Sequence, residues 1–402
     1  MNISLKMGNK TATYSWAVAL AAASVGLGIV REVLVIALLG ISRANDELQA
    51  YLSVIYSISL IGDAIKLAGL NLFDRVPLHR LIIAASIVSS PIAIAVAVAV
   101  WYFVPVTTFP LLLLVALGGV LGLFGFLLSA HRQRFGAFFP AHVVSVSSNL
   151  LLIPCILLIW ALKPPSLTTA FVIIFSLVPV MQTMALLFIR VNSSQNVHNN
   201  RVPLREVISV FARQVFGALG KVIFQASLRI LTFTAGEGLL SILNILIRFF
   251  SSLKLVLVDS FIGLNLQKWA DDTGGSKYYL THSHNFLSGS LHLITTSLLL
   301  LLAVMVSEMY LGGNPLTFAV LAGLILSFGF ILESLTRISF FYLNTQEINT
   351  RLVWGFNFYE LPIAIGGMIL VAALQAGPLW LLWLWYLVRP VSQYLYLKNW
   401  RK

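Results

Sequence analysis

The sequence is short of charged residues. Asp, Glu, Lys and Arg make up 10 % of its 402 residues, against roughly 25 % in an average soluble domain. Apolar residues make up 59 %, and the mean hydropathy is +0.92. This shortage excludes a soluble globular protein and a disordered chain. It also excludes a nucleic-acid-binding protein, because the basic excess behind the pI of 9.9 is spread thinly along an apolar chain.

Cysteine is nearly absent as well. Cys155 is the only one, so neither a disulfide within the chain nor a cysteine metal site is possible. His282 and His284 are close enough in sequence to share a metal, but we interpret them as solvated loop residues, and we expect no metal and no organic cofactor. The Gly-rich Lys-Ser/Thr motif that cradles nucleotide phosphates is missing too. We therefore expect no nucleotide as an energy source, which leaves the membrane potential or H⁺ or Na⁺ as a coupling ion.

Long apolar stretches are what the sequence has instead. Twelve of them are long enough to cross a bilayer, and their continuous apolar character favours helices over the alternating strands of a barrel. The sequence therefore predicts an all-α polytopic membrane protein. The stretches lie near 13–40, 47–73, 80–104, 108–130, 138–162, 167–190, 207–235, 238–266, 285–309, 316–342, 350–374 and 378–397.

Lys and Arg mark alternate links between these stretches. Cytoplasmic loops retain Lys and Arg, so the pattern predicts that both termini face the cytoplasm. The intervening links carry only Arg43 and Lys163. The basic segments carry Lys6 and Lys10, Arg75 and Arg80, Arg132 and Arg134, Arg190, Arg201 and Arg205, Lys268 and Lys277, Arg351, and finally Lys398, Arg401 and Lys402.

The two halves of the chain share a weak repeat. Gly-Leu-Asn-Leu at 69–72 ends the second stretch, and the same four residues at 263–266 end the eighth, about half a chain later. The match is short enough to arise by chance, but its position, orientation and spacing agree. We therefore expect two six-helix lobes related as parallel repeats, with the substrate site between them. The lobes would comprise residues 1–190 and 207–402, joined by a cytoplasmic linker at 191–206.

Charges inside the stretches are concentrated in the first two helices of each lobe. A charge at the bilayer centre costs roughly 2.5 kcal/mol or more and usually faces the bundle interior or a wet cavity. The sequence therefore predicts a central hydrophilic cavity with a net positive charge. The charged residues are Arg31 and Glu32, Asp63 and Lys66, Arg213, Lys221 and Arg229, and Arg248, Lys254 and Asp259, while later helices add Glu333, Arg337 and Glu360.

Helix periodicity selects the candidate ligands among these charges. Lys221 and Arg229 are two i, i+4 steps apart and share one helix face. Arg31, Arg229 and Arg248 have no carboxylate three or four residues away in their own helix, and Arg31 and the adjacent Glu32 are expected to point apart. A planar guanidinium matches phosphate oxygens. We therefore expect Arg31, Arg229, Arg248 and Lys221 to bind a large anion such as a diphosphate.

The carboxylates leave alternatives open. Glu333 and Arg337 could form an ion pair within one helix, as could Asp63 and Lys66, and Lys254 could carry its charge to the membrane interface. Carboxylates inside a membrane are also candidates for a gate or for binding a coupling cation. The candidates are Glu32, Asp46, Asp63 and Asp259.

Two parts of the sequence resemble a known family. Residues 26–40 read GLGIVREVLVIALLG and are followed by Ala-Asn-Asp at 44–46. Residues 225–248 run from Gln225 through Arg229, Gly-Glu-Gly and Ser-Ile-Leu-Asn to Arg248. Both parts are similar to signatures of the MurJ/MviN lipid II flippases, which belong to the multidrug/oligosaccharidyl-lipid/polysaccharide (MOP) exporter superfamily. The resemblance implies two MATE-like six-helix lobes, and it matches Arg31, Asp46 and Arg248 to positions in the family's cavity and outer gate.

The resemblance also implies a function. It indicates a flippase of the bacterial inner membrane, not an enzyme, that moves a polyprenyl-diphosphate-linked saccharide from the inner to the outer leaflet by alternating access. The saccharide would be lipid II or an exopolysaccharide or O-antigen repeat unit, and membrane lipids and glycan-assembly enzymes would be partners. The chain departs from the family in three ways. Val25 stands where the family has Arg, and the paired Arg of the family's second helix is absent. Two further helices, which family members have after the twelfth, are also not expected here. These departures fit a relative that carries a saccharide other than lipid II.

Two other functions remain as alternatives. One is a cation-coupled small-molecule or drug exporter of the same superfamily, which would need buried carboxylates without an excess of cations. The other is a membrane enzyme such as a glycan polymerase or glycosyltransferase. A polymerase would need a long external loop, whereas the external links here are only a few residues long.

Overall fold

The chain folds into a bundle of helices that are long and apolar enough to cross a membrane. The computed structural model describes residues 10–70, 72, 76–105, 107–134, 140–188, 202–254, 258, 315–346, 355–357 and 359–400. Every regular element within these residues is helical, and 8 helices contain a spanning segment. The shorter apolar segments Asn149–Leu162 and Leu239–Ser251 accompany them. The prediction of an all-α polytopic membrane protein is confirmed.

The helices follow the predicted stretches closely. The stretch near 285–309, the second half of 238–266 and residues 191–201 of the predicted linker lie outside the described residues. The first six helices are α1 (Lys10–Leu39), α2 (Arg43–Leu70), α3 (Leu78–Phe103), α4 (Phe109–Arg134), α5 (Pro140–Leu162) and α6 (Leu167–Phe188). The others are α7 (Leu204–Ala235), α8 (Leu239–Leu253), α11 (Pro315–Gln346), α13 (Glu360–Leu374), α14 (Pro378–Trp383), η2 (Leu384–Val388) and α15 (Arg389–Trp400).

Two helices differ from the predicted stretches. α7 begins at Leu204, inside the segment predicted as the linker, because the extended backbone of Pro203 ends the connection there. The last stretch is a continuous rod in which the π-helical segment η2 separates α14 from α15. Such π-helical turns often mark functional sites, and η2 lies beside the charged cavity described below.

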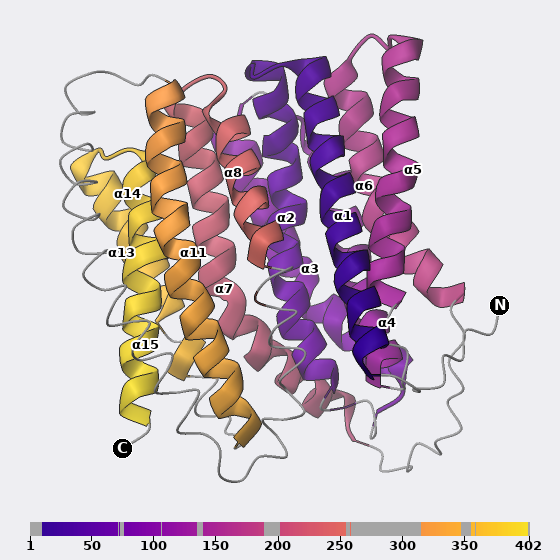
Figure 1. Cartoon of the computed structure of the whole chain (residues 1–402), viewed down its shortest axis with the longest axis vertical. Helices are drawn as coiled ribbons and strands as arrows, with labels where there is room; N and C mark the ends of the chain where they lie inside the picture. The colour runs from indigo at the N-terminus through magenta and orange to yellow at the C-terminus, as the bar shows by residue number, and fades with distance from the viewer. Residues whose placement is uncertain are drawn as a thin grey trace.

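Two apolar cores divide the bundle, and α7 belongs to both. One core is formed by α1 to α6 with one side of α7 and includes Tyr51, Phe171 and Phe211. The other joins α7 to α8, α11, α13 and α14, and in it Phe224 stacks on Trp385 with ring centroids 4.2 Å apart. Figure 1 shows α7 between the indigo-to-magenta helices and the orange-to-yellow helices, and it packs on α2, α3 and α13. α7 therefore holds the two groups of helices together.

Glycines allow close approach within the first group. A Cβ at Gly118 of α4 would collide with the Ser176 carbonyl oxygen of α6, and one at Gly122 would lie 2.7 Å from Pro179. Small residues at i and i+4 are typical of closely packed membrane helices. These two helices therefore touch backbone to backbone.

The first described helix, α1, begins at the end of the bundle where the last, α15, ends (Figure 1). We call this end the basic end, because Arg80, Arg205 and Lys398 belong to helix termini there. The opposite end contains the short turns at 40–42 and 236–238. That the basic end faces the cytoplasm stays a prediction from the distribution of Lys and Arg.

Candidate functional site

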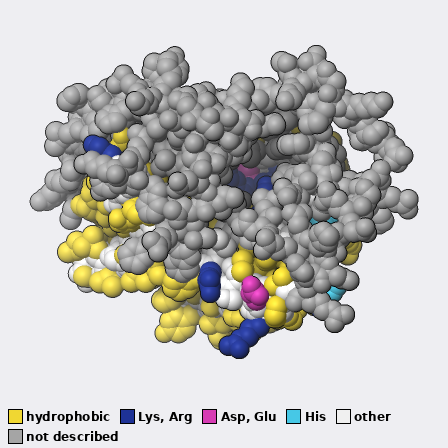
Figure 2. All heavy atoms as spheres, turned by 90° about the horizontal axis from the view of Figure 1, so that it is seen from below, with side chains coloured by type: hydrophobic (Ala, Val, Ile, Leu, Met, Phe, Trp, Pro, Cys, Tyr) yellow, Lys and Arg dark blue, Asp and Glu magenta, His cyan; other side chains and the backbone are white. Residues whose placement is uncertain are grey.

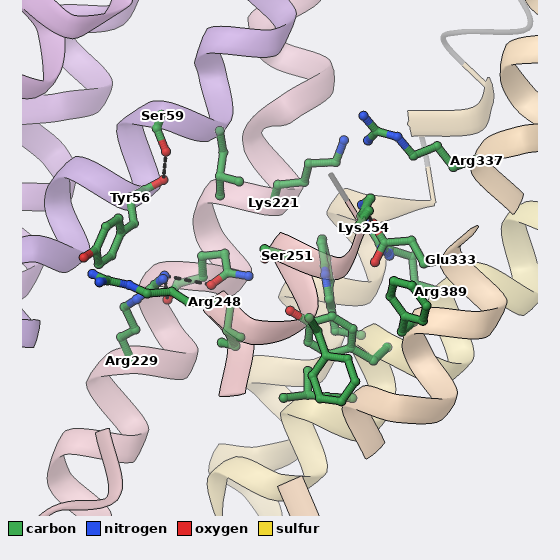
Figure 3. Close-up of a pocket in the computed structure, with 18 residues that line it drawn as sticks. Tyr56, Ser59, Lys221, Arg229, Arg248, Ser251, Lys254, Glu333, Arg337 and Arg389 are labelled. Atoms are coloured by element: carbon green, nitrogen blue, oxygen red, sulfur yellow. Dashed lines mark hydrogen bonds and ion pairs between the residues drawn. The ribbon is translucent and has the colours of Figure 1, made fainter. Parts of the chain in front are cut away.

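A cavity of about 300 Å³ lies between α2 and the helices of the second core (Figure 3). Helices α2, α7, α8 and α11 and the η2–α15 segment all contribute to its wall. Its polar and charged lining residues are Tyr56, Ser59, Lys221, Gln225, Arg229, Arg248, Ser251, Lys254, Glu333, Arg337, Tyr386 and Arg389.

The lining is strongly cationic. Six of these side chains are Lys or Arg, and Glu333 is the one carboxylate among them. Three of the four predicted anion ligands, Lys221, Arg229 and Arg248, line this cavity, and Arg31 does not. The arrangement can bind an anion with several charge-assisted hydrogen bonds.

Arg229 is held by neutral partners. Its side chain is only 5 % exposed, and it donates hydrogen bonds to Asn244 Oδ1 at 3.2 Å and Gln225 Oε1 at 2.7 Å. Its guanidinium also lies 5.0 Å from the centroid of the Tyr56 ring (Figure 3). Amide oxygens and an aromatic face orient a guanidinium without cancelling its charge. The positive charge of Arg229 is therefore still present for a ligand.

Arg31 and Arg248 share a single carboxylate. The Nε and Nη2 atoms of Arg31 donate to Glu32 Oε1 at 3.1 and 2.9 Å, and Arg248 forms an ion pair with the same oxygen. Glu32 therefore joins α1 to α8. The expectation that Arg31 and Glu32 point apart is wrong, because the long Arg side chain folds back onto its neighbour.

Arg31 thus belongs to the site indirectly. It also donates to Asn149 Oδ1 at 3.0 Å and lies over the Phe175 ring, so it is anchored to the first lobe. Arg248 lies 4.8 Å from the Tyr56 ring centroid, on the same aromatic side chain as Arg229. We call Arg31, Arg229, Arg248, Tyr56 and Glu32 the arginine cluster.

A second charged group lies in the same cavity and involves the second lobe alone. Arg389 is its centre and donates to Glu360 Oε1 at 3.0 Å and contacts Glu333 Oε2 at 3.3 Å. Lys254 pairs with Glu333, and Lys221 Nζ lies 3.6 Å from Glu360 Oε1. We call Lys221, Lys254, Glu333, Arg337, Glu360 and Arg389 the second-lobe network.

The network was only partly foreseen. Glu333 pairs with Lys254, the residue directly after α8, and with Arg389 of α15, so it is not simply the partner of Arg337 in its own helix. Lys254 is part of a cavity wall and an ion pair, not a charge at the interface. Sequence reasoning missed Arg389 as a site residue, although an Arg within the twelfth apolar stretch was a usable signal.

Asp46 closes the end of the bundle opposite the basic end. Its carboxylate accepts hydrogen bonds from the Gly238 and Ser241 backbone N–H groups at 2.6 and 2.8 Å and from the Ser241 hydroxyl at 2.6 Å. It therefore caps the N-terminus of α8 from α2, where a negative charge is favoured. Gly238 has φ +78°, and a Cβ there would lie 2.7 Å from Ile41. The two turns are in tight contact.

Arg43 adds to this closure. Its backbone N–H donates to Glu237 Oε1 at 3.1 Å, and its guanidinium lies 3.9 Å from the centroid of the Phe233 ring. Charged atoms are visible in a hollow when the molecule is seen from the basic end (Figure 2). The contacts of Asp46 and Arg43 thus close the bundle at one end, and a charged hollow opens toward the basic end.

The four carboxylates predicted to form a gate or to bind a coupling cation differ in what the structure shows of them. Glu32 is paired with two arginines, and Asp46 is engaged in the cap. The side chain of Asp63 and all of Asp259 lie outside the described residues. A coupling cation at any of them stays a prediction. Among the described residues, no group of three or more His, Cys, Asp or Glu is placed to hold a metal ion.

Comparisons with known proteins bear on the fold. No protein-family model matches the chain, and no curated protein sequence matches it. Among solved structures, the chain is similar to the lipid II flippase MurJ in an inward closed conformation, with a TM-score of 0.64, 16 % identity, and coverage of 95 % of this chain and 86 % of that one. An inward-facing multidrug resistance MATE family transporter of the MOP superfamily also matches, with a TM-score of 0.46, 14 % identity, and coverage of 99 % and 96 %.

The likeness to the lipid II flippase shows the fold. The resemblance predicted from residues 26–46 and 225–248 is therefore confirmed at the level of architecture. That similar structure is of a flippase, which is a transport protein and not an enzyme.

Proposed function

We propose that the protein is a flippase for a polyprenyl-diphosphate-linked saccharide, either lipid II or an exopolysaccharide or O-antigen repeat unit. It would carry this lipid from the inner to the outer leaflet of the bacterial cytoplasmic membrane. Both termini would face the cytoplasm, membrane lipids would surround the protein, and glycan-assembly enzymes would supply and receive the substrate. It would act as a transporter and not as an enzyme.

The observation that carries the proposal is the charge of the cavity. Six cationic side chains line it, against three carboxylates that line it or pair with those cations, Glu32, Glu333 and Glu360. Arg229, whose charge no carboxylate cancels, and Arg248 lie beside the Tyr56 ring. A diphosphate offers several oxygens to such a cluster, and guanidinium groups match them bidentately. A drug exporter for organic cations would need the opposite charge balance, which makes it the weaker alternative.

The position of the closures supports transport by alternating access. The cavity faces the basic end, so a lipid headgroup from the inner leaflet would enter there. The Asp46 cap would have to release the N-terminus of α8 before the headgroup could leave on the other side. The two lobes would rock about the fixed arginine cluster, as expected for transporters built from repeats. The membrane potential or an ion such as H⁺ or Na⁺ would supply the energy.

A depletion experiment in the host tests the proposal. Removal of the protein should cause polyprenyl-diphosphate-linked saccharides to accumulate in the inner leaflet, and labelled lipid in each leaflet would be measured. Re-expression of the wild type should reverse the accumulation. Absence of any such accumulation would refute the proposal.

Variants connect the experiment to the cavity. Arg248→Ala should fail to restore transport at normal expression, because it removes a cation from the arginine cluster. Arg213→Ala is the matched control, since Arg213 is exposed, lies on α7 and does not line the cavity. Full transport by Arg248→Ala would remove the assignment of this cavity.

A further inference from the structure

A buried polar seam joins the two lobes between the Asp46 cap and the arginine cluster. At one end of it Asp46 of α2 accepts hydrogen bonds from Ser241 of α8, and at the other end the ring of Tyr56 of α2 lies beside Arg248 of α8. Ser241 and Arg248 are seven residues apart, which is about two helical turns. The two helices therefore face each other between these contacts, and we call this stretch the α2–α8 seam.

Two amide side chains, Gln49 and Asn244, belong to the seam. Gln49 follows Asp46 by three residues on α2, and Asn244 lies between Ser241 and Arg248 on α8. Residues three or four apart share a helix face, so both amides lie on the faces that form the two contacts. Gln49 is 3 % exposed and Asn244 is 2 % exposed, and neither lines the cavity. The two amides are therefore separate from the diphosphate site.

A chain of hydrogen bonds fixes the orientation of the Gln49 amide. Asn45 Nδ2 donates to the Gly40 carbonyl oxygen at 3.0 Å, which leaves Asn45 Oδ1 to accept from Gln49 Nε2 at 3.4 Å. A carbonyl oxygen can only accept, so the chain runs in one direction. Gln49 Oε1 is buried and accepts no hydrogen bond from the residues that the structure describes. The first lobe thus leaves an unpaired acceptor in the seam.

Asn244 leaves the opposite kind of group unpaired. Its Oδ1 atom accepts a hydrogen bond from Arg229 Nε at 3.2 Å. A guanidinium has donors only, so this amide cannot be reversed. Asn244 Nδ2 is buried and finds no acceptor within the described part of the chain. The second lobe thus leaves an unpaired donor in the seam.

This pair of groups selects a ligand by its chemistry. Buried polar atoms are rarely left without a partner in native proteins. A phosphate or carboxylate could accept from Asn244, but it has no hydrogen to donate to Gln49. A metal ion could bind the Gln49 oxygen only. A hydroxyl group donates and accepts at once, so the seam suits a neutral, hydroxyl-bearing ligand.

We propose that Gln49 and Asn244 bind a hydroxyl group of the transported saccharide when the seam parts at the Asp46 end. The inference rests on the proposed function, in which the Asp46 cap releases α8 while the diphosphate stays at the arginine cluster. The saccharide would then lie between that cluster and the exit. One sugar hydroxyl would donate to Gln49 of the first lobe and accept from Asn244 of the second.

Lipid binding to purified full-length protein tests this subsite. The protein carries Asp46→Asn, which should weaken the closure over the seam. The probes are undecaprenyl diphosphate, the same lipid with one galactose, and the galactosyl lipid with its sugar hydroxyls O-methylated, each titrated by calorimetry in mixed micelles. The galactosyl lipid should bind at least fivefold more tightly than either of the others, because the methylated sugar keeps its ring and its acceptor oxygens but has no hydroxyl to donate.

Gln49→Met isolates the contact, because it removes the acceptor and keeps a side chain of similar length. Added to Asp46→Asn, it should abolish the advantage of the galactosyl lipid and leave the affinity for undecaprenyl diphosphate within twofold. Ser89→Ala is the matched control, since it also removes a buried polar group. The Ser89 hydroxyl already donates to the Ala85 carbonyl oxygen of its own helix at 2.7 Å, so this variant should keep the full advantage.

Two results would overturn the subsite. One is equal affinity of the Asp46→Asn protein for the galactosyl lipid and its methylated form, which would leave the two amides to water. The other is an undiminished advantage of the galactosyl lipid in folded Gln49→Met protein. If Gln49→Met does not fold, the comparison of the galactosyl and methylated lipids decides alone. Failure of the proposed function gives a different result, because undecaprenyl diphosphate would then not bind the wild type at all.

Discussion

Arg229 and Arg389 are both buried guanidinium groups in the cavity wall, yet their partners differ in kind. Arg229 is surrounded by the amides of Gln225 and Asn244 and by the Tyr56 ring. Arg389 is surrounded by the carboxylates of Glu333 and Glu360. One charge is therefore oriented and left available, and the other is neutralised and used to join helices. The comparison shows that the number of cations in a cavity overstates the charge that a ligand can meet.

Removal of Arg389 should produce the largest loss of stability. Arg389→Met leaves Glu360, which is 1 % exposed, without its closest cationic partner, and breaking one side of a buried ion pair costs about 3–5 kcal/mol. The free energy of unfolding, measured by denaturation in mixed micelles, should fall by about that amount. Glu360→Gln in the same chain should recover part of the loss. A fall below about 1 kcal/mol would show that the network does not hold these helices together.

Replacement of Arg229 should reduce transport strongly and the free energy of unfolding only modestly. Arg229→Met leaves only neutral acceptors unpaired, which costs about 1–3 kcal/mol, so the free energy of unfolding should fall less than in Arg389→Met. Leaflet transport of the lipid-linked saccharide should nevertheless fall tenfold or more. Equal destabilisation by Arg229→Met and Arg389→Met would contradict the difference between a guanidinium held by neutral partners and one paired with carboxylates.

Removal of the Asp46 charge should weaken the closure at the end of the bundle opposite the basic end. Asp46→Asn replaces the charged cap of α8 by a neutral one, at a cost within the 0.5–2 kcal/mol range of cap losses. In a Cys155→Ser background, a cysteine at Ile41 should react faster with a membrane-impermeant thiol reagent when Asp46→Asn is present. An unchanged labelling rate would mean that the cap does not hold this end closed.

The smallest effect is expected at Tyr56. Tyr56→Leu removes the aromatic face beside Arg229 and Arg248, and each cation–π contact contributes about 0.5–1 kcal/mol. Transport should fall by a few-fold, while Tyr56→Phe should stay close to the wild type because it keeps the ring. A loss with Tyr56→Phe as large as with Tyr56→Leu would point to the hydroxyl instead.

The sequence was sufficient to predict most of the architecture. Continuous apolar stretches located each described helix, because a bilayer leaves few other ways to satisfy the backbone. The same principle identified Arg229, Arg248 and Lys221 as cavity residues, since charges within such stretches are costly and face the interior. The spacing of Lys221 and Arg229 along α7 did not reveal that Lys221 approaches Glu360 of α13 whereas Arg229 contacts Tyr56 of α2.

The pairing of charges could not be predicted in the same way. Glu32 joins α1 to α8, and Glu333 joins α8, α11 and α15. These contacts depend on how distant helices pack, whereas sequence spacing reports only on neighbours within one helix. Asp46 illustrates the same limit, because its partners at Gly238 and Ser241 lie in the other half of the chain.

The most direct test of the central claim compares two ligands of opposite charge on the purified wild-type protein. We predict that undecaprenyl diphosphate binds, that Arg229→Met weakens this binding tenfold or more, and that an organic cation such as ethidium does not bind in the cavity. Binding of ethidium together with no binding of undecaprenyl diphosphate would contradict the account and favour an exporter of cationic small molecules.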